Sequence, residues 1–192
     1  MKHDNLVIDV SMHTGEDTAV YLAKDFDVVA IEANPALVER AKVAFADAID
    51  TGRLRIYEAA IAEQAGSARL AVADDMTIWS SLSPAFIELH KARGTRYRYL
   101  EVPAVSFESV LAEVGIPHYL KVDIEGLDML CVRALQGFAR SVSSSSHGTT
   151  PSLLHGTPGT LTTRSWAGSA TPGSPTCPPS TSARLAFAGE PR

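Results

Sequence analysis

The chain has 192 residues, of which 45% are hydrophobic and 20% charged, and its formal net charge is −5. This length and composition are those of one ordinary globular domain. The negative charge argues against a general binder of nucleic acids or anionic membranes, because such proteins use clustered Lys and Arg.

The sequence contains no sign of a membrane or secreted protein. No apolar run approaches the roughly 20 residues of a membrane-spanning helix, and Asp4 and Asp9 interrupt any apolar signal region. Cys131 and Cys177 lie far apart in very different sequence, which is neither a disulfide framework nor a metal-binding spacing. We therefore expect a cytoplasmic protein with reduced thiols.

Up to about residue 138, short apolar runs alternate with segments of helical period. The predicted elements are, in chain order, a strand at 5–10, a helix at 16–24, a strand at 27–34, a helix at 35–50, a strand at 54–63, two antiparallel strands at 67–74 and 96–105 around a polar connection, a helix at 106–115, a strand at 118–126 and a helix at 127–138. Continuous apolar strands that alternate with helices predict an α/β fold with a parallel sheet covered on both faces.

From Ala139 onward the sequence changes character. It is mostly Ser, Thr, Pro, Gly and Ala, it contains no Lys, Asp, Ile or Tyr, and Glu190 is its only acid. Such a stretch cannot bury enough apolar surface to offset the entropy lost on ordering, so residues 139–192 are predicted to be a disordered low-complexity tail after an incomplete domain at 1–138. Two origins stay open, a natural flexible tail and a shifted reading frame, and the abrupt junction favours the second.

The first predicted strand is followed by a short polar turn that opens into a helix, and this turn is placed to hold a cofactor. In open α/β sheets, ligands bind beyond the carboxyl ends of the strands. A dinucleotide site requires the glycines of G-x-G-x-x-G, whereas this turn has only Gly15, and Asp9 at the strand end would repel a pyrophosphate. The G-K-[S/T] sequence of an ATP phosphate loop is also absent. NAD and ATP are therefore disfavoured.

Two strand-end acids favour a cationic ligand with a ribose. Asp9 ends the first strand, and Glu32 ends the second, at the spacing where a carboxylate accepts hydrogen bonds from ribose hydroxyls. S-adenosylmethionine has a ribose, an α-ammonium group and a sulfonium, and it has no phosphate. Each acid alone has a structural alternative, Asp9 as a turn cap and Glu32 as a solvated acid. Together they favour S-adenosylmethionine.

Five motifs resemble those of the FkbM-type methyltransferases, which are class I S-adenosylmethionine-dependent enzymes. In chain order these motifs are VIDVSMHTGEDT, VVAIEANPALV, AIAEQAGSARL, WSSL and YLKVDIEGLDML. The resemblance implies a Rossmann-like parallel sheet with helices on both faces and an inserted antiparallel hairpin. Because nothing from Ala139 onward resembles the family, we expect this sheet to be truncated after its fourth strand.

The resemblance also implies a cofactor site. Its residues are Asp9, Ser11, His13, Thr14, Gly15, Glu32, Asn34 and Asp123. Asp9 and the turn backbone would hold the methionine end, and Glu32 would bind the ribose with Asn34 beside it. The family has glycine where this chain has Ser11. Because glycine allows positive φ, a serine is tolerated there if its φ is negative and is otherwise expected to weaken binding.

Methyl transfer is an in-line displacement, so the protein must align the reactants and remove the proton of a hydroxyl acceptor. By the same resemblance, Asp123 is the predicted base, and Glu125 shares that role or binds the acceptor. These two carboxylates could contribute to a divalent-ion site, but no third ligand has a convincing spacing, so no metal is predicted.

Four other residues have expected structural roles. Lys121 is expected in a buried Lys–Asp pair rather than in catalysis, Thr14 starts a variant capping box, and Cys131 belongs to the core. Trp79 either lines the acceptor pocket or pins the hairpin onto the sheet.

The predicted function is S-adenosylmethionine-dependent methyl transfer to a hydroxyl of a sugar or other small metabolite, with no nucleic-acid or membrane partner. An inactive remnant that still binds the cofactor is the alternative, and a dinucleotide-dependent oxidoreductase is less favoured.

Overall fold

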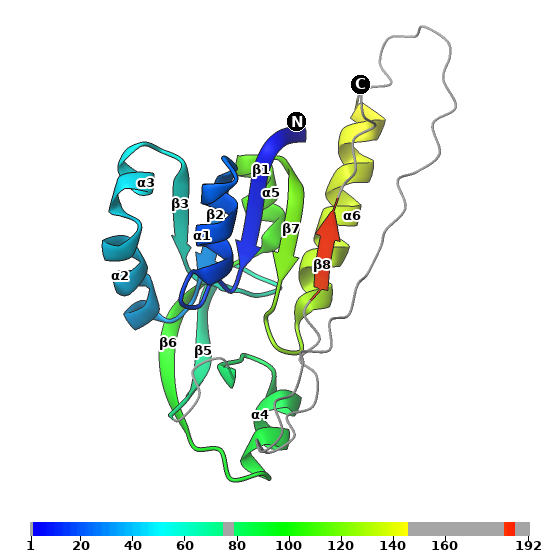
Figure 1. The fold of residues 1–192 in the computed structure, drawn as a ribbon. Coiled ribbons are helices and arrows are strands. Elements are labelled where there is room, and N and C mark those ends of the chain that lie inside the picture. Colours follow the sequence, from blue (N-terminus) through cyan, green and yellow to red (C-terminus); the bar gives the residue numbers. More distant parts are fainter. Residues whose placement is uncertain (1, 75–78, 146–182, 187–192) are drawn as a thin grey trace, which may run out of the picture.

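The structure, a computed structural model, describes residues 2–74, 79–145 and 183–186 (Figure 1). Its elements are β1 (Lys2–Val10), α1 (Glu16–Ala23), β2 (Asp27–Glu32), α2 (Pro35–Ala44), α3 (Ala46–Asp50), β3 (Leu54–Glu58), β4 (Ala60–Ile61), β5 (Gly66–Ala73), α4 (Pro84–Lys91), β6 (Tyr97–Val105), α5 (Phe107–Val114), β7 (Ile116–Val122), α6 (Asp128–Ser145) and β8 (Ala183–Ala186).

The main sheet has the strand order β3-β2-β1-β7-β8. The first four of these strands are parallel, as the alternation of strands and helices predicts. β8 pairs with β7 in the antiparallel direction and adds a fifth strand. The strand order changes direction at β1, because the chain passes from β1 to β2 on one side and returns to β7 on the other.

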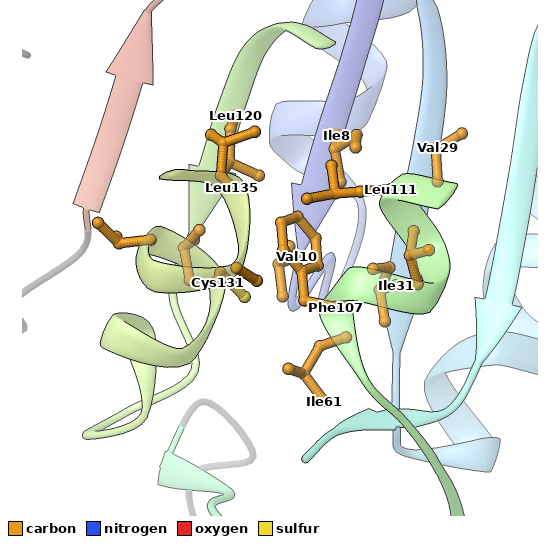
Figure 2. Close-up of a cluster of buried hydrophobic side chains, with 14 residues drawn as sticks. Ile8, Val10, Val29, Ile31, Ile61, Phe107, Leu111, Leu120, Cys131 and Leu135 are labelled. Atoms are coloured by element: carbon orange, nitrogen blue, oxygen red, sulfur yellow. The ribbon is translucent and has the colours of Figure 1, made fainter. Parts of the chain in front are cut away.

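Helices cover both faces of the parallel strands, which confirms the predicted layers. On one face α5 and α6 bury an apolar cluster that includes Ile8, Phe107 and Leu135, and Figure 2 shows these side chains between the helices and the strands. On the other face α1, α2 and α3 pack on Val28 and Ala30. Neighbouring residues of one strand thus serve opposite cores, as the period of two in a strand requires.

The small sheet has the order β4-β6-β5, with β5 and β6 antiparallel as predicted for the hairpin. β4 is a short strand parallel to β6. The single strand predicted at 54–63 is therefore wrong, because the chain leaves the main sheet at Glu58 and enters the small sheet at Ala60. The buried Ala59 separates the two strands.

The helix predicted at 35–50 is two helices, α2 and α3, that meet at Phe45. This residue has φ of −116° and ψ of 25°, outside helical values. Its side chain packs in the cluster around Val28 and Ala30, and the ring lies against Gly15. The break therefore places an aromatic ring under the turn that follows β1.

The polar connection between the hairpin strands contains a helix that the sequence analysis did not predict. Ser83 caps α4 by accepting a hydrogen bond from the N–H of Phe86 at 3.4 Å, and Pro84 occupies the first turn. This Ser–Pro pair is a start signal for a helix, but the short length of α4 hides its period.

α6 continues to Ser145, so it crosses the domain boundary predicted at residue 138. The rest of the predicted tail lies outside the described residues, except for the strand β8, and the division into two segments stays a prediction. Among the described residues, no helix is long and apolar enough to cross a bilayer.

Candidate functional site

The predicted site residues meet at the carboxyl end of the parallel sheet, where the strand order changes direction. This is the position at which open α/β sheets bind ligands. The turn after β1 (residues 11–15) and the loop after β7 (residues 123–127) begin side by side, since the N–H of Asp123 donates to the carbonyl of Val10 at 3.3 Å. The two predicted groups, for the cofactor and for the acceptor, are therefore adjacent.

The turn after β1 has a left-handed backbone at two residues that are not glycine. Ser11 has φ of 64° and His13 has φ of 53°. The N–H groups of Ser11 and Met12 both donate to the carbonyl of Ile31 in β2, at 2.9 and 3.1 Å. A left-handed residue with a side chain costs on the order of 1–2 kcal/mol. Ser11 thus has the positive φ that is unfavourable for a serine, and not the negative φ at which a serine would be tolerated easily.

Glu32 joins this turn to the start of α2. Its carboxylate accepts one hydrogen bond from the N–H of His13 and another from the N–H of Asn34, each at 2.8 Å. The residue is only 6% exposed. Burial raises the pKa of this carboxyl, and the bonds from the backbone oppose that change. Glu32 therefore lies beside the turn, and its contact with a ribose stays a prediction.

Asn34 has a structural task that the sequence analysis did not assign. It is the N-cap of α2, where its side chain accepts a hydrogen bond from the N–H of Ala36 at 3.1 Å, and Pro35 follows it. Asn34 is buried next to Glu32, so the predicted neighbourhood is present.

Asp9 lies fully buried beneath the turn. Thr18 in α1 donates to one carboxylate oxygen at 2.7 Å, and the ammonium group of Lys121 lies 3.1 Å from the other. Burial raises the pKa of Asp9, and the charge of Lys121 opposes that change. The same ammonium group donates to the carbonyl of Ser11 at 2.7 Å. A buried Lys–Asp pair is therefore present, but it joins Lys121 to Asp9 and not to Asp123, the acid two residues further along the chain.

Gly15 precedes α1 and is required for two reasons. Its φ is 85°, and a Cβ at this position would lie 2.5 Å from the ring of Phe45. The prediction that Thr14 caps this helix is wrong, because Gly15 takes the N-cap position and offers no side chain. Thr14 is exposed one residue earlier.

His13 is half-buried at the turn. Burial lowers the pKa of its imidazole, and the nearby charge of Lys121 lowers it further. The ring is therefore neutral at pH 7, so one ring nitrogen is able to donate a hydrogen bond and the other to accept one.

The loop after β7 holds the predicted catalytic carboxyls. Glu125 has φ of 39°, and the side chain of Asp128 accepts a hydrogen bond from the N–H of Ile124 at 3.1 Å. Burial raises the pKa of Glu125 to about 7, and the charges of Asp123 and Asp128 act in the same direction. A carboxyl that titrates near neutral pH is well matched to removing a proton from a hydroxyl.

The segment before α4 packs on this loop. The hydroxyl of Ser81 donates to the carbonyl of Glu125 at 2.9 Å. Gly126 lies against Ser83, because a Cβ there would be 3.2 Å from the Ser83 hydroxyl oxygen. α4 therefore lies beyond the carboxyl ends of the parallel strands, next to the candidate catalytic loop (Figure 1).

Trp79 packs on α4. Its ring centroid is 4.6 Å from that of His90, and Phe86 stacks on His90 at 4.3 Å. This aromatic group holds the segment before α4 to the helix. The observed ring contact of Trp79 is with His90 of α4, and the two roles considered for it, at the acceptor pocket or on the sheet, stay predictions.

Two further expectations concern metal and thiol chemistry. Among the described residues, no group of three or more His, Cys, Asp or Glu side chains is arranged to hold a metal ion. Cys131 lies on α6 and is buried in the core, as predicted, and burial raises the pKa of its thiol.

The family model described as the methyltransferase FkbM domain matches residues 9–147. The chain belongs to the FkbM methyltransferase family. This confirms the predicted family, and the match begins at Asp9 and contains every predicted site residue. It extends past Ala139, from which no resemblance was expected, to residue 147, just beyond the end of α6 at Ser145.

A crystal structure of an FkbM methyltransferase from Methylobacillus flagellatus KT is also similar to the chain, with 10% sequence identity and a TM-score of 0.38. The alignment covers 72% of this chain and 38% of that protein. The chain thus spans less than half the length of that FkbM methyltransferase. No curated protein matches the chain.

Proposed function

We propose that this FkbM-family chain transfers a methyl group from S-adenosylmethionine to a hydroxyl of a sugar or other small metabolite. The single observation that carries the proposal is the meeting of two polar segments at the switch point. The N–H of Asp123 bonds to the carbonyl of Val10, so the loop with the candidate base starts beside the turn with the candidate cofactor groups.

The residues of the turn fit this cofactor. Glu32 is an acid at the end of β2, and its carboxylate is already held at the turn by two N–H groups. Ser11, His13 and Gly15 would offer backbone groups to the methionine end, and Thr14 is exposed at the same turn. When bound, S-adenosylmethionine would supply a methyl group on a good leaving group, the sulfonium.

The protein would then position the acceptor and remove its proton. A hydroxyl oxygen becomes a better nucleophile as it loses its proton to a carboxylate. Glu125, with a pKa of about 7, is half-charged at neutral pH and is the stronger candidate for this step. Asp123 lies directly at the end of β7 and would bind the acceptor or assist Glu125.

A small acceptor suits the surroundings of this loop. The segment from Trp79 to Ser83 packs against Glu125 and Gly126, which leaves the carboxyl only partly exposed. The net charge of −5 argues against a nucleic acid as the acceptor, because proteins that bind nucleic acids use exposed basic clusters. We place the reaction in the cytoplasm, as the sequence predicts.

The test is product formation by the full chain. Purified protein is incubated with S-adenosylmethionine and sets of sugars, polyols and other hydroxylated metabolites, and separately with amines and thiols. S-adenosylhomocysteine is measured by mass spectrometry. Release that depends on a hydroxylated acceptor, together with a mass gain of one methyl group on that acceptor, supports the proposal. Release with an amine or thiol acceptor alone contradicts the choice of a hydroxyl.

A second candidate function is cofactor binding without turnover. It is favoured by the expected truncation of the domain: among the described residues, the parallel strands of the main sheet are β3, β2, β1 and β7. This candidate predicts that S-adenosylmethionine binds to the chain while no acceptor leads to S-adenosylhomocysteine.

A further inference from the structure

One buried lysine connects three parts of the candidate cofactor site. Lys121 extends from β7 under the turn after β1, and its side chain is 7% exposed. Its ammonium group lies 3.1 Å from the carboxylate of Asp9 and donates to the carbonyl of Ser11 at 2.7 Å. Asp9 in turn accepts a hydrogen bond from Thr18 in α1. The connected groups thus come from β7, β1, the turn and α1.

The hydrogen bond from Lys121 holds the carbonyl group of Ser11, a residue with an unfavourable backbone conformation. Ser11 has a left-handed backbone that a serine does not favour. Its N–H is held from β2 by the carbonyl of Ile31, and its carbonyl is held from β7 by Lys121. The peptide groups on both sides of the unfavourable φ are therefore fixed by two different strands.

A lysine is suited to this task because it has three donors and no acceptor. One donor meets the carbonyl of Ser11. The carboxylate of Asp9, 3.1 Å away, forms an ion pair with the buried ammonium group and neutralises its charge. A buried charge without a partner is strongly unfavourable. Asp9 is therefore needed to keep Lys121 charged and in place beneath the turn.

We propose that Lys121 is a positioning residue that fixes the shape of the turn after β1 for the cofactor, and that Asp9 acts on the cofactor through Lys121 rather than by direct contact. The inference rests on the proposed function for the identity of the cofactor. It differs from a purely structural ion pair, whose loss would lower the stability of the whole domain without a specific effect on the turn or on affinity.

The test compares variants of the full chain by amide hydrogen exchange without cofactor and by calorimetric titration with S-adenosylmethionine. In Lys121→Met, we expect the amides of Ser11, Met12 and His13 to exchange about tenfold faster or more, relative to the amides of β6. We expect the affinity for S-adenosylmethionine to fall by a similar factor.

Two further variants and a control separate positioning from folding. Asp9→Asn combined with Lys121→Met removes both buried charges, so it keeps the test possible if the single variant does not fold. Lys121→Arg keeps the charge and donors, and partial recovery of affinity is expected. Lys42→Met removes an exposed lysine that pairs with Glu39 and Glu58, and it should change neither turn exchange nor affinity.

The inference is overturned if the double variant exchanges at the turn like the unaltered chain, if exchange rises equally in β6, or if the turn loosens while affinity stays the same. Failure of the unaltered chain to bind S-adenosylmethionine is a different result. It contradicts the proposed function, and faster exchange confined to the turn would then still support the positioning role of Lys121.

Discussion

The turn after β1 and the loop after β7 begin side by side, yet they are held in different ways. The turn is fixed by buried groups from both neighbouring strands, with Glu32 and the carbonyl of Ile31 on one side and Lys121 on the other. The loop is held by the hydrogen bond from the N–H of Ile124 to the side chain of Asp128 and by the bond from Ser81, and its acids are only half-buried.

This difference separates the part of the site that holds a fixed shape from the part that is suited to proton transfer. The carboxylate of Asp9 is buried with an opposite charge, so it has little freedom to exchange a proton with a ligand. Glu125 is instead half-buried, and burial together with the charges of Asp123 and Asp128 raises its pKa to about 7. The turn therefore suits a cofactor that binds in one way, and the loop suits chemistry on the acceptor.

The largest expected effect lies on the loop. Glu125→Gln keeps the size of the side chain but removes the base, so we expect the methyl-transfer rate constant to fall by about 10²–10⁴-fold. Affinity for S-adenosylmethionine should stay within about twofold, because the turn is untouched. Timed assays of S-adenosylhomocysteine release measure the rate constant, and calorimetric titration measures the affinity for S-adenosylmethionine.

Glu101→Gln is the matched control for that variant, since Glu101 is exposed on β6 and accepts a hydrogen bond from Ser67 across the small sheet. It should leave the rate unchanged. A Glu125→Gln protein that retains the full rate would remove Glu125 from the mechanism and return the base role to Asp123.

Glycine substitutions compare the packing of the two segments directly. An alanine at Gly15 would be placed 2.5 Å from the ring of Phe45, an alanine at Gly126 would be 3.2 Å from the hydroxyl of Ser83, and Gly94 has open space. All three have positive φ. We expect losses of unfolding free energy of about 3, 2 and 1 kcal/mol for Gly15→Ala, Gly126→Ala and Gly94→Ala.

Urea unfolding followed by circular dichroism measures these three losses. Equal values for Gly15→Ala and Gly94→Ala would show that the ring of Phe45 moves away easily. The turn would then be less tightly packed than its contacts indicate.

The pH dependence of the rate tests the loop without any mutation. Glu125 must lose its proton to act as the base, and its pKa is raised to about 7. The rate should therefore be flat above that pH and fall about tenfold per pH unit below it. The pH–rate profile of the unaltered chain should show this fall, and the profile of the residual activity of Glu125→Gln should lack it. A fall centred near pH 4 would contradict the assignment.

The smallest expected effect is at Ser11. Ser11→Gly relieves the left-handed backbone but gives the unfolded chain more freedom, so we expect a net gain of about 0.5–1 kcal/mol in stability. Tighter binding of S-adenosylmethionine by a few-fold is expected, because the turn keeps its shape at lower cost.

Asp25→Gly is the control, because Asp25 also has a positive φ, of 62°, but is far from the turn in an exposed position. It should alter stability and leave affinity unchanged. Weaker binding by Ser11→Gly would show that the serine hydroxyl has a direct role at the turn.

Much of the fold follows from local patterns in the sequence. The apolar runs at β1, β2, β3 and β7 identify the four parallel strands, and the acids at the ends of β1 and β2 identify the switch point. These features are visible because strand burial on both faces leaves long apolar runs. The break at Phe45 is not visible, since residues 35–50 keep a helical period through it, and the break depends on packing against Gly15.

The support of the turn could not be predicted from local patterns. Lys121 and Ser11 are 110 positions apart in the chain, and nothing in either motif states that they meet. The sequence does place Lys121 near an acid, but it does not show that the partner is Asp9. Likewise, Glu32 is recognisable as a strand-end acid, while its bonds to the backbone of His13 and Asn34 exist only in the folded chain.

The most direct test of the account is a calorimetric titration of the full chain with S-adenosylmethionine and, separately, with NAD. Glu32→Ala is the test variant, and Glu39→Ala, an exposed acid on α2, is its control. We predict roughly micromolar binding of S-adenosylmethionine, no binding of NAD, a loss of affinity in Glu32→Ala and none in Glu39→Ala. A folded chain that gives no heat with S-adenosylmethionine, or that binds NAD instead, would contradict the account.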